Sequence, residues 1–234
     1  MKRIYGLVLI ILLVGLANSA TLTVQDHSKV IGFLLSHPVA LKNWLKSRGR
    51  SGRVRPEEVL NFILSLSRTS RGSAGIGQVV NRVRVLSRRT RGVRVQGPYN
   101  SVVQRIRSAR SLEELRNILS SQKERIAKGR AANRMSSSLI IGLGIASQII
   151  DDGMAKGIYS PESYVAFLNT NKRNRGILNA LADEILDIAK NDAVGALVGA
   201  VAGPEGAVAG ATLASSTSVA EMALDLILHP EPAY

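Results

Sequence analysis

The stretch from Ala193 to Ala220, AVGALVGAVAGPEGAVAGATLASSTSVA, constrains the fold more than any other part of the chain. Its one charged residue, Glu205, lies in a Gly203-Pro204-Glu205-Gly206 segment that is typical of a turn. Glycine recurs at a spacing of four on both sides of this turn: Gly195, Gly199, Gly203, Gly206 and Gly210. Residues four apart share a helix face, and a glycine stripe lets a second helix approach backbone to backbone. The stretch therefore predicts two small-residue helices folded back on each other, a glycine-zipper hairpin over 193–228.

Most of the remaining chain has the apolar spacing of amphipathic helices, which predicts a mainly α, multi-helix protein. Two helix starts have clear signals. Pro56-Glu57-Glu58 combines proline at the first helical position with acids that suit the positive end of the helix dipole. Ser111-Leu112-Glu113-Glu114 has the serine and the acid three residues later that form a capping box.

Residues 76–95 are ambiguous between helix and strand. The valines of Arg82-Val83-Arg84-Val85 and Val93-Arg94-Val95 alternate with arginine as strand residues do. The surrounding apolar positions have helical spacing, so we expect a helix from Ile76 to Arg88. A short β piece near 82–95 remains the alternative.

The first twenty residues predict an export signal. Lys2 and Arg3 precede an apolar run from Ile4 to Leu16, and small residues at 17–20 suit cleavage. The run is short for a transmembrane anchor, which needs roughly 20 apolar residues, so the alternative of a retained anchor is disfavoured. Cysteine is absent, so an exported form has no disulfide to support its core.

Charge divides the mature chain into two regions. From Lys42 to Arg134 there are 23 Lys and Arg against 5 Asp and Glu, a net of +18, and the last 100 residues carry 5 against 11, a net of −6. We therefore expect a basic helical region over 21–134, with an arginine-rich linker at 47–55, and a neutral-to-acidic helical region over 135–234. Such asymmetry predicts a basic surface for an anionic partner, or docking of the two regions on each other.

The candidate residues for an anionic partner are arginines of the basic region: Arg48, Arg50, Arg53, Arg55, Arg82, Arg84, Arg88, Arg89, Arg91 and Arg94. Arginine binds phosphate and carboxylate groups well. The expected partner is an anionic lipid, lipopolysaccharide or a cell-wall polymer. Nucleic acid is disfavoured because Trp44, Phe62 and Tyr99 are the only aromatics from 42 to 134, too few for a base-stacking platform.

The sequence predicts no catalytic site, cofactor or metal site. His27, His37 and His229 are isolated, so we expect surface or capping roles for them. The acid groups Asp151-Asp152 and Asp183-Glu184-Asp187 suit solvated helix faces better than a catalytic carboxylate pair. An exported hydrolase that uses these acids is a third, weaker hypothesis.

Span length argues against two full membrane crossings by the glycine stretch. Ala193 to Gly203 is 11 residues, about 16 Å of helix at 1.5 Å per residue, against a hydrocarbon core of about 30 Å. Three interpretations stay open: tight packing in a soluble fold, a half-inserted hairpin or pore, and homo-oligomerisation through the glycine stripe.

The glycine spacing, with alanine and valine between, resembles the glycine-zipper regions of bacteriocin-like exported peptides. That resemblance covers about 30 residues of the tail and implies permeabilisation of a competitor's membrane. Together with the basic region it predicts an exported, non-enzymatic protein that acts at membranes or cell envelopes. The alternative is a structural envelope protein that holds an anionic polymer (lipopolysaccharide, cell-wall polymer or nucleic acid) without membrane insertion.

Overall fold

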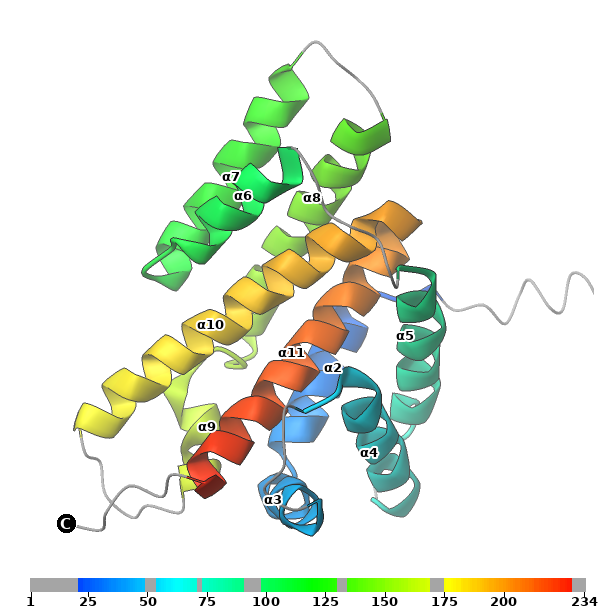
Figure 1. Ribbon diagram of the computed structural model, residues 1–234, viewed down its shortest axis with the longest axis vertical. Coiled ribbons are helices and arrows are strands. Elements are labelled where there is room, and N and C mark those ends of the chain that lie inside the picture. Colours follow the sequence, from blue (N-terminus) through cyan, green and yellow to red (C-terminus); the bar gives the residue numbers. More distant parts are fainter. Residues whose placement is uncertain are drawn as a thin grey trace, which may run out of the picture.

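The computed structural model describes residues 21–48, 54–70, 73–90, 98–129, 134–168 and 175–228, and all regular structure in these ranges is helical (Figure 1). The mainly α prediction is confirmed. Predicted signal peptide 1–20 and linker residues 49–53 lie outside the described residues. The elements are α2 (Val24–Leu35), α3 (Pro38–Ser47), α4 (Pro56–Thr69), α5 (Ile76–Thr90), α6 (Pro98–Arg107), α7 (Leu112–Lys128), α8 (Arg134–Ala155), α9 (Pro161–Leu168), α10 (Arg175–Gly199), the 3₁₀ turn η1 (Ala200–Ala202) and α11 (Gly203–Leu228).

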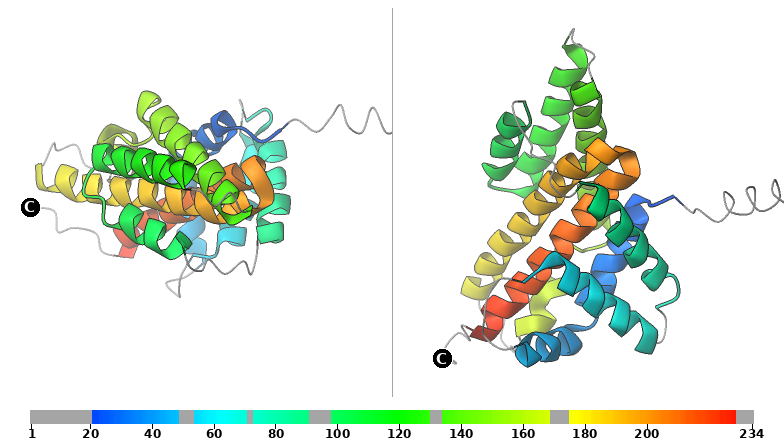
Figure 2. Two further views of the ribbon diagram at one scale, coloured as in Figure 1. Left: turned by 90° about the horizontal axis from the view of Figure 1, so that it is seen from above. Right: turned by 45° about the vertical axis from the view of Figure 1, so that its right-hand side comes forward.

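The antiparallel pair α10 and α11 runs through the middle of the molecule, and the other helices pack around it (Figure 1). Helix α11 packs on α2, α3, α4 and α5 from the first half of the chain, α10 packs on α6 and α9, and both pack on α8. Helix α7 lies along α8, and together they form the projection at one end of the molecule (Figure 2). Helices from both sides of residue 134 share one hydrophobic core.

The start of α7 follows the predicted capping signal with one difference. The Ser111 hydroxyl accepts a hydrogen bond from the Glu114 backbone N–H at 3.1 Å, as expected of an N-cap serine. The Glu114 carboxylate accepts from the backbone N–H of Arg110 at 2.7 Å, one residue before the cap. The acid therefore fixes the chain that enters the helix.

The strand alternative is wrong for residues 82–90, which are helical in α5. Val80, Val83 and Leu86 are buried at helical spacing, and the arginines between them point elsewhere. Burial against α4 and α11 therefore outweighs the local β preference of the Arg-Val alternation. Val93–Val95, the rest of the proposed β piece, lies outside the described residues.

Glycine allows α10 and α11 to approach with their backbones in contact. A Cβ atom built on Gly195 would lie 2.5 Å from the carbonyl oxygen of Gly210, and one built on Gly199 would lie 2.0 Å from that of Gly206. Cβ atoms on Gly206 and Gly210 would meet the Gly199 and Gly195 carbonyl oxygens at 2.4 Å and 2.2 Å. No side chain fits at these four positions without separating the helices.

The turn between the two helices lies earlier than the sequence predicts. The chain leaves α10 through η1 and reverses at Gly203, whose φ of +84° suits glycine. A Cβ atom on Gly203 would meet nothing within 4 Å, so this glycine forms the turn and takes no part in the helix contact. Pro204, Glu205 and Gly206 already belong to the first turn of α11.

Replacing Gly199 with alanine tests the backbone contact. We expect Gly199→Ala to lower the free energy of unfolding by about 1–3 kcal/mol, because the methyl group overlaps the Gly206 carbonyl and pushes the helices apart. Urea unfolding followed by circular dichroism measures the change.

Gly32 of α2 provides the matched control, since a Cβ there meets nothing within 4 Å. Gly32→Ala should raise stability by about 0.5–1 kcal/mol through helix propensity alone. Equal stability of Gly199→Ala and the parent protein would contradict the close contact.

Candidate functional site

A cluster of buried polar side chains joins α2, α10, α11 and the turn before α9. We call it the polar cluster; its members are His27, Tyr159, Asp192, Thr212 and Ser215. His27, Asp192, Thr212 and Ser215 are fully buried, and Tyr159 is 5% exposed. Buried polar groups at this density need mutual hydrogen bonds to be tolerated in a core.

Asp192 is the centre of the polar cluster. Its Oδ2 accepts hydrogen bonds from the Tyr159 hydroxyl at 2.6 Å and from the Ser215 hydroxyl at 2.8 Å. The His27 Nε2 atom lies 3.7 Å from the same oxygen. Among the described residues, Asp192 Oδ1 has no hydrogen-bond partner.

Thr212 sets the tautomer of His27. The Thr212 hydroxyl donates to the backbone carbonyl of Val208 at 2.8 Å, so its oxygen is left to accept from His27 Nδ1 at 3.3 Å. We therefore assign the proton of neutral His27 to Nδ1. The lone pair on Nε2 then faces the Asp192 carboxyl group.

Burial decides the protonation of the cluster. It lowers the pKa of His27 to about 3 and raises the pKa of Asp192 to about 8, although the hydrogen bonds from Tyr159 and Ser215 oppose the second shift. Burial and the neighbouring Asp192 also raise the pKa of the Tyr159 hydroxyl. At neutral pH the cluster therefore holds a neutral imidazole beside a neutral carboxylic acid, which avoids two buried charges.

A second polar contact ties α2 to α8 next to the cluster. The Ser28 hydroxyl donates to Asp152 Oδ2, and Lys156 Nζ lies 2.8 Å from the same oxygen. Asp152 raises the pKa of His27 and Lys156 lowers it, both by less than burial does. The two contacts fix the position of α2 against α8 and α11.

The expected surface or capping role is wrong for His27, which is fully buried. His37 does occupy the N-cap position of α3, although its side chain makes no capping bond, and His229 lies outside the described residues. The sequence contained one usable signal for the polar cluster: Asp192 stands alone beside a long apolar stretch, where an unpaired charge would be costly.

Three of the predicted anion-binding arginines bind other side chains of the protein. Arg82 forms a two-oxygen ion pair with Glu205 of α11, with Nη2 2.9 and 2.8 Å from Oε1 and Oε2, and Arg48 pairs with Glu58. Arg84 donates to Asn61. Among the described members, Arg55, Arg88 and Arg89 are the exposed ones; Arg50, Arg53, Arg91 and Arg94 lie outside the described residues.

The acid groups lie on the surface except for Asp152, which is half-buried and bonded to Ser28. Asp151 pairs with Arg116 at 2.7 Å, and Asp183 and Asp187 are exposed on α10. Glu184 is also exposed; partial burial and the neighbouring acids Asp187, Asp225 and Asp183 raise its pKa. No group of three or more His, Asp or Glu side chains that could hold a metal ion occurs in the described part of the chain.

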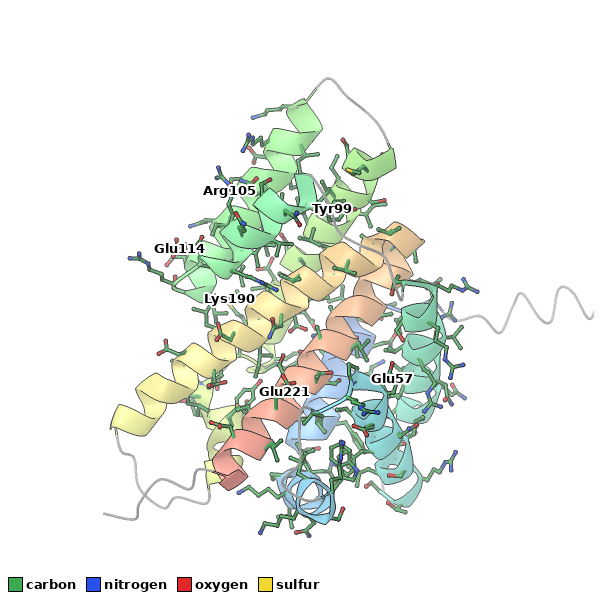
Figure 3. The ribbon with its side chains drawn as sticks, viewed as in Figure 1. Glu57, Tyr99, Arg105, Glu114, Lys190 and Glu221 are labelled. Carbon is green, nitrogen blue, oxygen red and sulfur yellow. The ribbon has the colours of Figure 1, made fainter. Side chains whose placement is uncertain are left out.

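A groove of about 880 Å³ lies over the outer side of the α10–α11 contact. We call it the seam groove. Its lining residues on α10 and α11 are Asn191, Val194, Gly195, Val198, Gly199, Gly210, Leu213, Ala214, Thr217, Ser218 and Glu221. The others are Arg48, Val54, Arg55, Pro56, Glu58, Ser87 and Thr90. Figure 3 labels one residue on each of three helices that border the groove: Lys190 on α10, Glu221 on α11 and Glu57 on α4.

No protein-family model, curated protein or solved structure matches the chain. Two described segments, Met135–Ala155 and Leu181–Asp225, are long and apolar enough to cross a membrane. In their most apolar 18-residue windows 39% and 50% of the residues are buried, so both segments also qualify as core helices of a folded protein.

The polar cluster predicts an unusual pH profile of stability. Between pH 3.8 and 6.5 the folded state carries one proton, on Asp192, and the unfolded state also carries one, on His27. The pair therefore contributes no pH dependence to the free energy of unfolding in this range. Above pH 6.5 the unfolded histidine loses its proton while folded Asp192 keeps its own up to about pH 8. Stability should therefore fall by about 1.4 kcal/mol per pH unit, roughly 2 kcal/mol in all.

Asp192→Asn removes the titrating acid and keeps an oxygen that accepts from Tyr159 and Ser215. Its free energy of unfolding should stay level from pH 6.5 to 8, whereas that of the parent protein falls. Urea unfolding at half-unit pH steps measures both. Parallel decline of the two proteins over this range would contradict the raised pKa of Asp192.

Proposed function

We propose that this is an exported, non-enzymatic protein that acts at membranes or cell envelopes, and that α10 and α11 form a glycine-zipper hairpin that associates with the membrane. The observation that carries the proposal is the backbone contact between these two long apolar helices. A pair joined in this way does not need its covering helices to stay paired, so it can leave them as one unit.

The tip of the hairpin supports this function. Val201, in η1, is 41% exposed and is one of the few large apolar side chains at the surface of the described residues. Ala202 beside it is also exposed, and Glu205 is held by Arg82. An apolar tip of this kind is suited to enter the boundary between lipid headgroups and acyl chains first.

The basic helices would bring the protein to an anionic surface. Arg88 and Arg89 are exposed near the end of α5, and the basic region as a whole carries a large excess of positive charge. Each basic residue close to an anionic leaflet contributes about 1 kcal/mol of attraction, which salt weakens. The predicted export signal, residues 1–20, would place the protein at a periplasmic, secreted or envelope location.

The alternative function is an envelope protein that holds an anionic polymer without membrane insertion. The polymer would be lipopolysaccharide, a cell-wall polymer or nucleic acid. The exposed arginines of α5 favour this function as well. Homo-oligomerisation through the glycine stripe would require α10 and α11 to separate, because their glycines face each other. The two functions differ in what happens at the hairpin tip.

A fluorophore at the tip distinguishes them. Because the chain has no cysteine, Val201→Cys gives a single labelling site for a polarity-sensitive dye. With anionic vesicles at low salt, we expect a blue shift of the dye and quenching by a quencher placed in the acyl region. Both signals should persist at high salt, since an inserted apolar tip is not screened.

Val39→Cys on α3 is the matched control, because Val39 is also an exposed valine, at 70%, and lies far from the tip in the chain. Its dye should respond weakly to vesicles. Binding that salt abolishes, with no acyl-region quenching at position 201, would overturn insertion and favour the polymer-holding function.

A further inference from the structure

The polar cluster is shared between the hairpin and the helices that cover it. Asp192 of α10 and Thr212 and Ser215 of α11 belong to the hairpin, whereas His27 of α2 and Tyr159, before α9, do not. The hydrogen bond from Ser215 to Asp192 joins the two hairpin helices and persists if they move as one unit. The contacts of His27 with Thr212 at 3.3 Å and with Asp192 at 3.7 Å are broken by the same movement. Because α2 packs on α11 more than on any other helix, departure of the hairpin exposes His27 to solvent.

His27 has no place for a second proton while the hairpin is in the fold. Its side chain is fully buried, and Nδ1 donates to Thr212. The Nε2 atom, which would take the proton, has no hydrogen-bond partner among the described residues and lies beside the carboxyl group of Asp192. Burial lowers the pKa of His27 to about 3, from 6.5 for an accessible histidine. Packing around the hairpin therefore keeps the imidazole neutral.

Charged groups of α8 act on His27 as well. Asp152 raises the pKa of His27 and Lys156 lowers it, and both effects are smaller than that of burial. Asp192 of α10 is a neutral acid at pH 7. The other charged residues of α2 and of the helices packed on it are Asp26 and Lys29 on α2, Lys42 and Lys46 on α3, Arg82, Arg84, Arg88 and Arg89 on α5, Arg134 and Asp151 on α8, and Glu205, Glu221 and Asp225 on α11. Because the two charges from α8 oppose each other, burial decides the protonation of His27, and this burial is lost when α11 leaves.

We propose that acidification triggers membrane insertion of the hairpin, with His27 as the group that takes up the proton when α10 and α11 leave α2. This inference rests on the proposed function at membranes and names the signal that would control it. Both nitrogen atoms of His27 then meet water, and the histidine binds a proton below about pH 6.5. A protonated side chain is costly in the buried site, so acid shifts the protein toward the inserted state.

Asp192 decides whether a proton is gained in net terms. In the protein unfolded in water, Asp192 releases a proton while His27 binds one, so the pair gains none between pH 3.8 and 6.5. In the inserted hairpin Asp192 remains bonded to Ser215 and lies nine residues from Val201 at the tip, about 14 Å along the helix. This depth is within half of the hydrocarbon core, about 15 Å, where a carboxylate is costly. Asp192 therefore keeps its proton, and the inserted state holds one proton more than the folded state.

The size of the effect follows from this one extra proton. The equilibrium constant for insertion should rise about tenfold for each pH unit below 6.5, and about 100-fold between pH 7.5 and 4.5. Glu205 adds a second uptake, because this acid leaves Arg82 and enters the membrane with the tip. Glu205→Gln removes that contribution and keeps an oxygen that accepts from Arg82. It is therefore the background in which His27 is tested.

The test follows insertion of the tip against pH. The Glu205→Gln protein carries Val201→Cys with the polarity-sensitive dye and is mixed at high salt with phosphatidylglycerol vesicles, whose headgroup charge does not change between pH 4.5 and 7.5. Quenching by an acyl-region quencher at half-unit pH steps gives the ratio of inserted to free protein. We expect this ratio to rise about 100-fold from pH 7.5 to 4.5.

Two histidine variants locate the proton. His27→Asn replaces Nδ1 with an amide that still donates to Thr212 and does not titrate, so its ratio should stay level between pH 7.5 and 4.5. His37→Asn removes a histidine at the N-cap position of α3, outside the polar cluster, and should follow the parent profile.

Equal insertion at pH 7.5 and 4.5, or acid-dependent insertion that persists in His27→Asn, would overturn the trigger and leave the proposed function standing. Absence of acyl-region quenching at every pH would overturn both.

If His27→Asn fails to fold, as circular dichroism shows, Asp192→Asn decides. This variant has no acid to offset the proton that His27 binds on unfolding. Its equilibrium constant for unfolding in urea should therefore rise, from pH 6.5 to 4.5, about tenfold per pH unit more steeply than that of the parent protein. Parallel profiles of the two proteins would overturn the trigger.

Discussion

The fold depends on the contact between the backbones of α10 and α11. Four glycines keep this contact free of large side chains, so that the carbonyl oxygens of one helix lie against the glycine α-carbons of the other, with only alanine methyl groups beside them. The close approach maximises dispersion and permits weak Cα–H···O bonds. Because both helices are otherwise rich in alanine and valine, they form a slender central pair around which larger side chains from α2, α5 and α8 can pack.

The polar cluster adds a constraint of another kind. Apolar packing against small residues is tolerant of sliding, since alanine and valine surfaces offer few distinctive shapes. Asp192 of α10 accepts hydrogen bonds from Ser215 of α11 and from Tyr159, which precedes α9. His27 of α2 lies next to the same carboxyl group. Mismatched pairing would leave a buried acid without its partners, at a cost of several kcal/mol. The cluster thus favours one register of the central helices.

The sequence predicts where most of the helices lie, but not which helices contact one another. Helix starts at Pro56 and Ser111 depend on local chemistry within one turn, and both were predictable. The helical state of Arg82–Thr90 depends on burial against α4 and α11, which local β preference does not reveal. The burial of His27 was missed because its partners lie 165 to 185 residues away, at Asp192 and Thr212. Long-range partners of this kind leave no spacing pattern.

The position of α11 at the end of the described chain has a consequence for the order in which the helices can pack. Helices α2, α3 and α5 pack more extensively on α11 than on any other helix, whereas α4 packs on both α5 and α11. Contacts between such distant parts of a chain are slow to form, because a long loop must close first. Until α11 has been synthesised, α2, α3 and α5 lack the helix on which they pack most. The α4–α5 and α7–α8 pairs, which are close in sequence, can form before it.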